Sequence, residues 1–292
     1  MSDKKEKIFI SDWELRRMNP PGGKAVSIPE NAIISPLSRD WLDYGGERER
    51  VGGLERGTGH CIRWRVGNGQ DPRTGNGAKP KEEELRERIV ETGRKLYELG
   101  FVPATDGNIS VRLADGSVLI TASGVSKGKL APADMARISM DGKFISGRKP
   151  SSEYLLHLRV YAKRPDVLAV VHAHPPVATG LASAGIALDK PLTSEIVIGL
   201  GKVPLAPYAT PGTGEVSDSI TGLLESHNAI MLANHGVVTY GASLEAAFQR
   251  METVEQAAKI TLVAEHLGGG KLIPPDKVKK LEEIRKRLGE KG

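Results

Sequence analysis

The spacing of apolar residues changes several times along the chain, and each change predicts a different element. From Lys81 to Leu99 apolar residues recur every three or four positions, which predicts an amphipathic helix that ends at Gly100. Pro165 and Ser243 mark the end of one further helix and the start of another. The other predicted helices cover residues 153–164, 176–184, 243–267 and 271–288.

Strands are predicted between these helices. Asn108 to Leu113 and Ser117 to Thr121 flank Ala114-Asp-Gly116, which is the pattern of a β-hairpin. Apolar runs at Val167 to His174 and at Ala229 to Asn234 predict two buried strands. This mixture of hairpins and helices favours an α/β fold with three layers, α/β/α, around a central and largely antiparallel sheet.

The chain divides into three predicted regions. Residues 81–292 carry the pattern of helices and strands, and we predict that they form one domain. Residues 45–80 are dense in Gly and Arg and lack an apolar period, which predicts a flexible linker. Residues 1–44 are a separate N-terminal extension.

Composition and charge narrow the choice of partners. The formal net charge of +5 is modest for 292 residues, basic and acidic residues are interleaved, and only 4% of residues are aromatic. We therefore expect an anionic small molecule and no nucleic acid. Cys61 is the single cysteine, no apolar run has the length of a membrane span, and the N-terminus lacks an apolar secretory segment. These features predict a cytoplasmic protein without a membrane partner.

Three histidines and one glutamate supply the candidate chemistry. His172 and His174 lie two positions apart on a predicted strand, so their side chains point to the same face. His235 follows the next predicted strand, and Glu153 adds a carboxylate. Catalytic zinc sites commonly use three protein ligands and keep one position open. We therefore predict a divalent-metal site of these three histidines, with Glu153 as fourth ligand, as base, or as both in turn.

Four of the seven histidines lie outside this set. His157 lies four residues after Glu153 on the same face of a predicted helix, so we predict a packed core histidine, with a contact to the metal site as the alternative. Polar or Gly-rich surroundings predict surface positions for His60, His227 and His266.

Six separated motifs give the chain a resemblance to the class II aldolase family of fuculose-1-phosphate aldolase and its epimerase relatives. The resemblance runs from about Glu82 to the C-terminus. It implies the same three-layer fold, a phosphorylated sugar as substrate, and a homotetramer with sites between subunits. The motifs are Thr105-Asp-Gly-Asn-Ile-Ser110, Ile120-Thr-Ala-Ser-Gly124, Pro150-Ser-Ser-Glu153, His172-Ala-His174, Ala206-Pro-Tyr-Ala-Thr-Pro-Gly212 and Asn234-His-Gly236.

The resemblance implies roles for individual residues. His172, His174 and His235 match the family's metal ligands, usually of zinc, with another divalent metal as the alternative. Glu153 matches the catalytic acid/base. Glycines admit close backbone approach, and hydroxyl and amide groups donate to phosphate oxygens, although each such segment alone would be an ordinary turn. The positions that match the substrate-phosphate site are Gly107, Asn108, Ser123, Gly124, Ser151 and Ser152.

The same resemblance implies the reaction. The aldolases carry glutamate after the paired serines, as at Glu153, whereas the ribulose-phosphate 4-epimerases carry aspartate there. The implied activity is metal-dependent cleavage of a deoxyketose 1-phosphate, such as fuculose or rhamnulose 1-phosphate, to dihydroxyacetone phosphate and an aldehyde. The alternatives are a sugar-phosphate 4-epimerase or dehydratase, and a non-catalytic adducin-like scaffold. In fuculose-phosphate aldolase, a tyrosine that neighbouring subunits use as a proton donor aligns near Glu195, and a C-terminal tyrosine aligns near Leu288. Neither position is a tyrosine in this chain.

The N-terminal extension has a second, shorter resemblance. Phe9-Ile-Ser-Asp12, Leu15-Arg16 and Ile34-Ser-Pro-Leu-Ser-Arg-Asp40 are similar to the opening segment of corrinoid adenosyltransferases from ethanolamine-utilising microcompartments. This implies that residues 1–44 address the protein to the shell or cargo proteins of a bacterial microcompartment. The alternative is an extension with no role beyond solubility.

Overall fold

The computed structural model describes residues 81–287 in full and, before them, the backbone of five strands. The chain divides into two compact units, Met1–Pro80 and Lys81–Gly292. In the first unit β1 pairs in parallel with β3, and β5 pairs in antiparallel fashion with both β2 and β4. These strands are β1 (Ile8–Ile10), β2 (Val26–Pro29), β3 (Ala32–Ile34), β4 (Gly46–Arg50) and β5 (Cys61–Val66).

Strands β4 and β5 lie within residues 45–80, where the sequence predicts a flexible linker. Within this Gly- and Arg-rich segment, Ile62, Trp64 and Val66 alternate with arginine, which is the pattern of a β-strand. The surrounding Gly and Arg residues make this short pattern hard to recognise in the sequence. The motifs that predict targeting lie outside the described residues except where they overlap β1 and β3, and so do His60 and Leu288.

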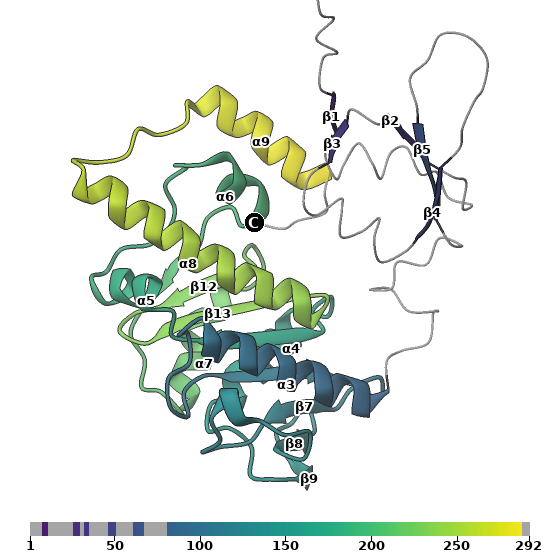
Figure 1. Cartoon of the computed structure of the whole chain (residues 1–292). Helices are drawn as coiled ribbons and strands as arrows, with labels where there is room; N and C mark the ends of the chain where they lie inside the picture. Colours follow the sequence, from purple (N-terminus) through teal and green to yellow (C-terminus); the bar gives the residue numbers. More distant parts are fainter. Residues whose placement is uncertain are drawn as a thin grey trace, which may run out of the picture. The chain divides into compact units, whose positions relative to one another are not determined.

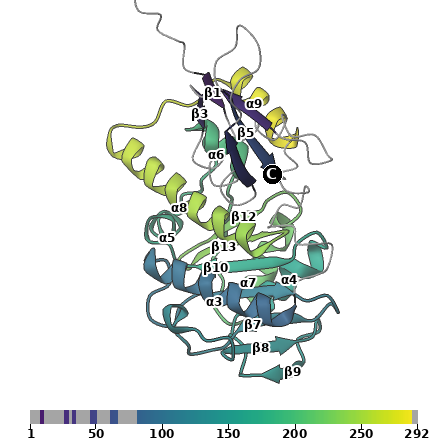
Figure 2. The ribbon, with the colours of Figure 1, turned by 45° about the vertical axis from the view of Figure 1, so that its right-hand side comes forward.

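An eight-stranded sheet forms the centre of the second unit, with helices on both faces (Figures 1 and 2). The strand order is β11-β12-β13-β10-β6-β7-β8-β9, and among these strands only the β11–β12 pair is parallel. The predicted three-layer α/β/α fold with a largely antiparallel sheet is therefore confirmed. The strands are β6 (Asn108–Arg112), β7 (Val118–Thr121), β8 (Met135–Ile138), β9 (Phe144–Gly147), β10 (Ala169–Ala173), β11 (Leu205–Ala206), β12 (Ala229–Leu232) and β13 (Gly236–Gly241).

All five predicted helices are present, with ends that differ by up to four residues. The sequence analysis does not predict α6, α7 or β13. The two helices have only six and seven residues, too few to show a clear helical period. The helices are α3 (Glu82–Glu98), η2 (Lys127–Lys129), α4 (Tyr154–Lys163), α5 (Pro176–Ser183), α6 (Ser194–Gly199), α7 (Gly214–Ile220), η3 (Thr221–Leu223), α8 (Leu244–His266) and α9 (Pro275–Arg287).

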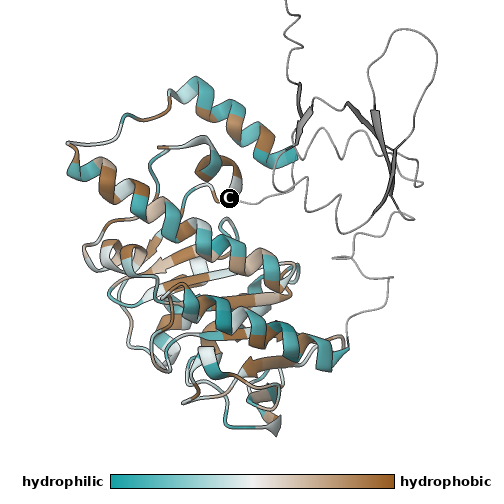
Figure 3. Ribbon diagram, viewed as in Figure 1, coloured by the Kyte–Doolittle hydropathy of each residue, from teal (hydrophilic) through white to brown (hydrophobic). Residues whose placement is uncertain are grey.

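Alternate residues of the central strands pack against different helical layers. Val171 and Met231 join the core formed with α3, α5 and α8, whereas Val170 and Ile230 join the core formed with α4 and α7. Because both faces are covered, β10 and β12 are buried throughout and are apolar apart from His172, and the central strands are largely hydrophobic in Figure 3. Among the described helices, none combines the length and apolar content needed to cross a membrane.

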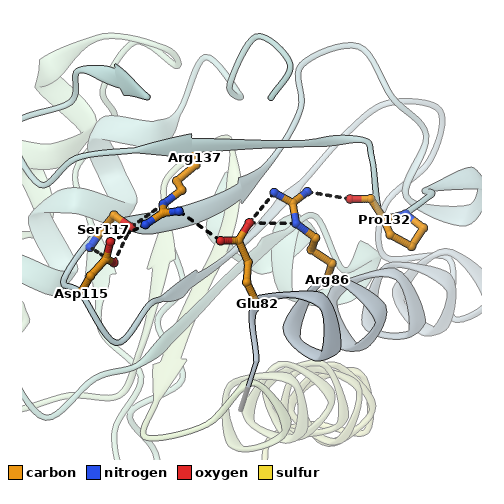
Figure 4. Close-up of polar contacts among 6 residues, drawn as sticks. All are labelled: Glu82, Arg86, Asp115, Ser117, Pro132 and Arg137. Carbon is orange, nitrogen blue, oxygen red and sulfur yellow. Dashed lines mark hydrogen bonds and ion pairs between the residues drawn. The ribbon is translucent and has the colours of Figure 1, made fainter. Parts of the chain in front are cut away.

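A network of ion pairs joins the start of α3 to the β6–β7 hairpin (Figure 4). Glu82 accepts hydrogen bonds from Arg86 at 2.6 Å and from Arg137 at 3.3 Å. Arg137 also pairs with Asp115 in the hairpin turn and donates to Ser117 Oγ at 2.9 Å. Arg86 donates in addition to the Pro132 carbonyl at 2.8 Å. The helix is thus fixed beside the strands that lead into the candidate site.

Gly107 allows the chain to pass close to β10 just before β6. Its φ of +68° is a left-handed conformation, and a Cβ there would lie 2.8 Å from the His172 carbonyl oxygen and 2.5 Å from Val102 Cγ1. Gly116, in the hairpin turn, has a φ of +86° but nothing within 4 Å of an added Cβ. Substitution of Gly116 therefore introduces backbone strain alone, whereas substitution of Gly107 introduces backbone strain and a steric clash.

We expect Gly107→Ala to destabilise the protein more than Gly116→Ala. The left-handed backbone alone should lower the free energy of unfolding by about 1 kcal/mol at Gly116. At Gly107 overpacking adds about 1–3 kcal/mol to that loss. Urea unfolding of the two variants measures the difference, and equal losses would show that the strand tolerates a side chain beside His172.

Candidate active site

The predicted metal ligands come from three elements that meet at one end of the sheet. His172 lies on β10 opposite Asn108 of β6, and His174 follows the end of β10. His235 lies in the turn between β12 and β13, where Asn234 adopts a φ of +55°. Glu153 is the residue before the first turn of α4. The sheet register and these strand ends bring all four predicted residues together.

The distances within this group are short. The three imidazole centroids lie 4.7–5.2 Å apart, and one nitrogen from each ring lies within 4.8 Å of the others. Glu153 Oε2 lies 3.3 Å from His172 Nε2, and Oε1 lies 3.1 Å from His235 Nε2. The nitrogens and the carboxylate thus converge on one point.

The hydrogen bonds of the ligands fit a divalent cation. His172 Nδ1 donates to the Val237 carbonyl at 2.9 Å, which leaves the lone pair of Nε2 facing the group. His174 Nδ1 lies 3.3 Å from Asp106 Oδ2, and its Nε2 lies 3.2 Å from His172 Nε2. Glu153 Oε1 is buried and makes no hydrogen bond to any described residue. Facing lone pairs and an unsatisfied carboxylate oxygen are mutually repulsive unless a cation lies between them.

The pKa shifts reflect the same crowding. Without a metal, burial acts to raise the pKa of Glu153, but the positive charge of protonated His172 and His235 outweighs it and lowers that pKa; a bound cation would act in the same direction. Burial acts to lower the pKa of His172, but Glu153 outweighs it and raises the pKa. Burial lowers the pKa of His174 to about 4, and His172 and His235 add to this effect. Glu153 is therefore an ionised carboxylate at neutral pH.

A pocket of about 400 Å³ opens beside this group. Glu153, His174 and His235 line it, whereas His172 is fully buried behind them. Thr105, Asp106 and Lys127 also contribute to its wall. The wall includes every residue that matches the family's phosphate site, and we call this set the small-residue cluster: Gly107, Asn108, Ser123, Gly124, Ser151 and Ser152.

Lys127 is a pocket residue that the sequence analysis missed. It is only 2% exposed, and its Nζ donates to the Thr105 carbonyl at 2.9 Å and to the Val125 carbonyl at 2.8 Å. The ammonium thus joins the two loops that carry Gly107 and Gly124. Burial lowers the pKa of Lys127 to about 8, while Asp106 and Glu153 act in the opposite direction. The sequence feature that could have indicated this role is the position of Lys127, three residues after Gly124 of the predicted phosphate site.

Two other residues differ from expectation in their surroundings. Asn108 Nδ2 donates to Glu153 Oε2 at 2.8 Å, so its amide lies at the carboxylate as well as in the small-residue cluster. Glu195, which aligns with a tyrosine of the family, is exposed in the first turn of α6 and does not line the pocket of this chain.

Two of the histidines predicted at the surface lie among the described residues. His227 is partly buried, with its Nδ1 2.9 Å from the Leu223 carbonyl, and His266 is exposed.

Comparison with known proteins agrees with this geometry. Residues 87–262 match the family model described as the class II aldolase and adducin N-terminal domain. The chain belongs to this family. Class II aldolases depend on a divalent metal, and the three-histidine group suits one. The relatives with named activities are lyases, and this protein is a lyase of the same family.

Two relatives and one solved structure illustrate the range of activities in the family. The 3-oxo-tetronate 4-phosphate decarboxylase of Escherichia coli K12 is 36% identical over 62% of this chain and 88% of its own. The 5-deoxy-D-ribulose 1-phosphate aldolase of Bacillus thuringiensis is 37% identical over 67% of this chain and 92% of its own. A structure of L-fuculose 1-phosphate aldolase is 31% identical and covers 73% of this chain and 100% of its own, with a TM-score of 0.65.

We expect metal binding to weaken when a histidine ligand is replaced and when the histidine ligands are protonated. His235→Ala should weaken metal binding by more than the roughly 10- to 100-fold that loss of an outer hydrogen-bond partner costs. Acid should release the metal from the unaltered protein as the pH drops below about 6, because imidazoles bind metals only when neutral and the metal competes with protons for them. Glu153 raises the pKa of His172, so His172 takes up a proton at a higher pH than His174 does.

Metal content after dialysis, measured by elemental analysis across this pH range, tests both expectations. His227→Ala is the matched control, because His227 bonds to a backbone carbonyl far from the group and should leave the metal bound. Full metal content in His235→Ala would contradict ligation by this residue.

Lys127→Met should weaken the binding of phosphorylated ligands. Loss of a charged hydrogen-bond donor typically costs about 1.5–3 kcal/mol, which corresponds to roughly 10-fold or more in KM. Lys129→Met is the matched control, because Lys129 belongs to the same short helix but is exposed. The measurement is KM together with the protection that inorganic phosphate gives against thermal unfolding. Equal effects of the two variants would show that only the net charge matters.

Proposed function

We propose that the protein is a zinc-dependent aldolase that cleaves a deoxyketose 1-phosphate to dihydroxyacetone phosphate and a short aldehyde. The observation that carries this proposal is an ionised carboxylate, Glu153, within 3.1–3.3 Å of two imidazoles in a group of three, beside the small-residue cluster. The pocket thus pairs a base and a metal-binding group with donors suited to a phosphate. The 5-deoxyribulose 1-phosphate aldolase among the relatives supports this type of substrate.

Aldol cleavage needs a proton removed from the C4 hydroxyl and a proton added at C3. The hydroxyl on C4 loses its proton, the C3–C4 bond breaks, and its electrons pass to C3 and the C2 carbonyl as an enediolate. A divalent metal supplies Lewis acidity that stabilises this developing negative charge. Glu153 begins as a base, so it can accept the hydroxyl proton and then return it to C3. One carboxylate therefore serves both proton transfers.

This assignment removes the need for the two tyrosines of fuculose-phosphate aldolase. Glu195 stands where one of them aligns, and it is exposed in α6. Leu288 stands where the other aligns and lies outside the described residues. Proton exchange through Glu153 alone is consistent with the loss of both.

At the other end of the substrate, the small-residue cluster and Lys127 would bind the phosphate. Serine hydroxyls and backbone N–H groups of the loops at Gly107 and Gly124 can donate to phosphate oxygens. The buried Lys127 ammonium, which joins these two loops, adds a positive charge below them. The phosphate would thereby hold C2 and C3 near Glu153.

A second candidate is decarboxylation of a phosphorylated 3-oxo acid, which the relative from Escherichia coli K12 and the absence of both tyrosines favour. Loss of CO2 from 3-oxo-tetronate 4-phosphate leaves the same enediolate of dihydroxyacetone phosphate. No hydroxyl proton has to be removed, but the carbon that loses CO2 must be protonated. Decarboxylation therefore gives the Glu153 carboxylate no proton to accept before the bond breaks, whereas aldol cleavage does. A carboxylate placed beside the histidine group therefore favours the aldol reaction.

The implied homotetramer and the targeting role of residues 1–44 stay predictions of the resemblances. Deletion of residues 1–44 tests the second of them. Unchanged partitioning of the shortened protein with shell proteins would remove the targeting hypothesis.

A substrate panel with a coupled assay for dihydroxyacetone phosphate tests the proposed function. We expect release from 5-deoxyribulose, fuculose or rhamnulose 1-phosphate, with one aldehyde per turnover and no release after chelation of the metal. Glu153→Gln should lower kcat by about 10²- to 10⁴-fold, because it removes the proton acceptor. Its metal content should persist, which separates loss of the base from loss of the metal. Release of dihydroxyacetone phosphate with CO2 from 3-oxo-tetronate 4-phosphate alone would establish the decarboxylase instead.

A further inference from the structure

Behind the pocket, a row of polar side chains is buried between β6 and α4. Asn108 and Ser110 alternate along β6 and so face the same helix, while His157 and Tyr161 lie one turn apart on α4. All four are at most 2% exposed. Polar groups buried this deeply are costly unless each has a hydrogen-bond partner.

These four side chains form one continuous chain of hydrogen bonds that ends at Glu153. Tyr161 OH lies 2.8 Å from Ser110 Oγ, which lies 2.6 Å from His157 Nδ1. His157 Nε2 contacts Asn108 Oδ1, and Asn108 Nδ2 lies 2.8 Å from Glu153 Oε2. The proposed mechanism uses Glu153 but assigns nothing to His157, Ser110 or Tyr161.

Glu153, at the end of this series of hydrogen bonds, determines which group donates and which accepts in each bond. An ionised carboxylate can only accept, so Asn108 must present Nδ2 to Glu153 and Oδ1 to His157. Oδ1 also only accepts, so the proton of His157 must lie on Nε2. A neutral imidazole then has an acceptor at Nδ1, which Ser110 Oγ fills by donating its proton. Ser110 in turn accepts from the Tyr161 hydroxyl.

The surroundings of His157 keep it neutral. Burial lowers the pKa of His157 to about 3, and His172 adds to this effect while Glu153 opposes it. Its two ring nitrogens contact a hydroxyl and an amide oxygen, and neither partner carries a charge. The single proton on the ring is therefore placed by its neighbours.

We propose that His157 is a positioning residue whose one tautomer, set by Ser110 and Tyr161, fixes the Asn108 amide so that it donates to Glu153. The Asn108 bond restrains Oε2 of the carboxylate. Oε1, which makes no hydrogen bond to any described residue, stays available to exchange a proton. The effect on turnover rests on the proposed role of Glu153, whereas the tautomer of His157 does not depend on it.

Two substitutions at His157 test the proposal against a purely structural role. Gln offers one amide donor and one carbonyl acceptor, so His157→Gln can replace both ring contacts, whereas Leu in His157→Leu can replace neither. We expect His157→Leu to lower kcat by about 10- to 100-fold with little change in KM or metal content. His157→Gln should stay within a few-fold of the unaltered protein. A role in packing alone would make Leu, the better-packing apolar residue, the milder change.

A double-mutant cycle with Asn108→Ala shows whether the effect passes through Asn108. Once the amide is absent, His157→Leu should have no further effect on kcat, so the two losses should not add. Additive losses would overturn the proposal. So would a His157→Leu protein that folds, holds metal and turns over like the original.

The ¹⁵N spectrum of the metal-loaded protein supplies a test that needs neither a variant nor a substrate. We expect His157 to show a protonated Nε2 and an unprotonated Nδ1 throughout pH 5–9. Protonation of both nitrogens, or of Nδ1 alone, would overturn the proposal. If no substrate of the panel is cleaved, the proposed function fails, and this spectrum still decides the orientation of the chain.

Discussion

The convergence of three imidazole nitrogens and one buried carboxylate on a single point is the constraint on which the rest of the second unit depends. His172 is fully buried, and its Nε2 lies 3.2–3.3 Å from His174 and Glu153. Such a group is favourable only around a shared positive charge, because burial of lone pairs and an anion without one is costly. Binding of a metal by this group would therefore be coupled to folding of this end of the sheet.

The pocket is lined by groups suited to a cation and by groups suited to an anion. At one end the histidine group and Glu153 are arranged for a cation and for proton transfer. At the other end Lys127 is buried beneath two glycine-containing loops, where its ammonium joins their backbones through two carbonyl groups. A substrate with a carbonyl at one end and a phosphate at the other would match both, and sugar phosphates have that form.

The family's different reactions can be understood from one shared intermediate. Aldol cleavage of a ketose 1-phosphate and decarboxylation of a 3-oxo-acid phosphate both leave the enediolate of dihydroxyacetone phosphate. What differs is whether a proton must be taken from a hydroxyl before the bond breaks. In aldol cleavage Glu153 would accept that proton, and Asn108 donates to one of its carboxylate oxygens. A buried row of neutral hydrogen bonds behind Asn108 holds that amide in place.

By itself, the sequence determined the long elements and the types of residue in the site. Periodicity located α3, α8 and the β6–β7 hairpin, and the spacing of His172 and His174 predicted that they share one face. Only the tertiary structure decided that Lys127 lies under the pocket and that His157 bonds to Asn108, since these contacts join residues 22–49 positions apart. Local patterns report which side of an element a residue occupies, but the partner on that side depends on how the elements pack.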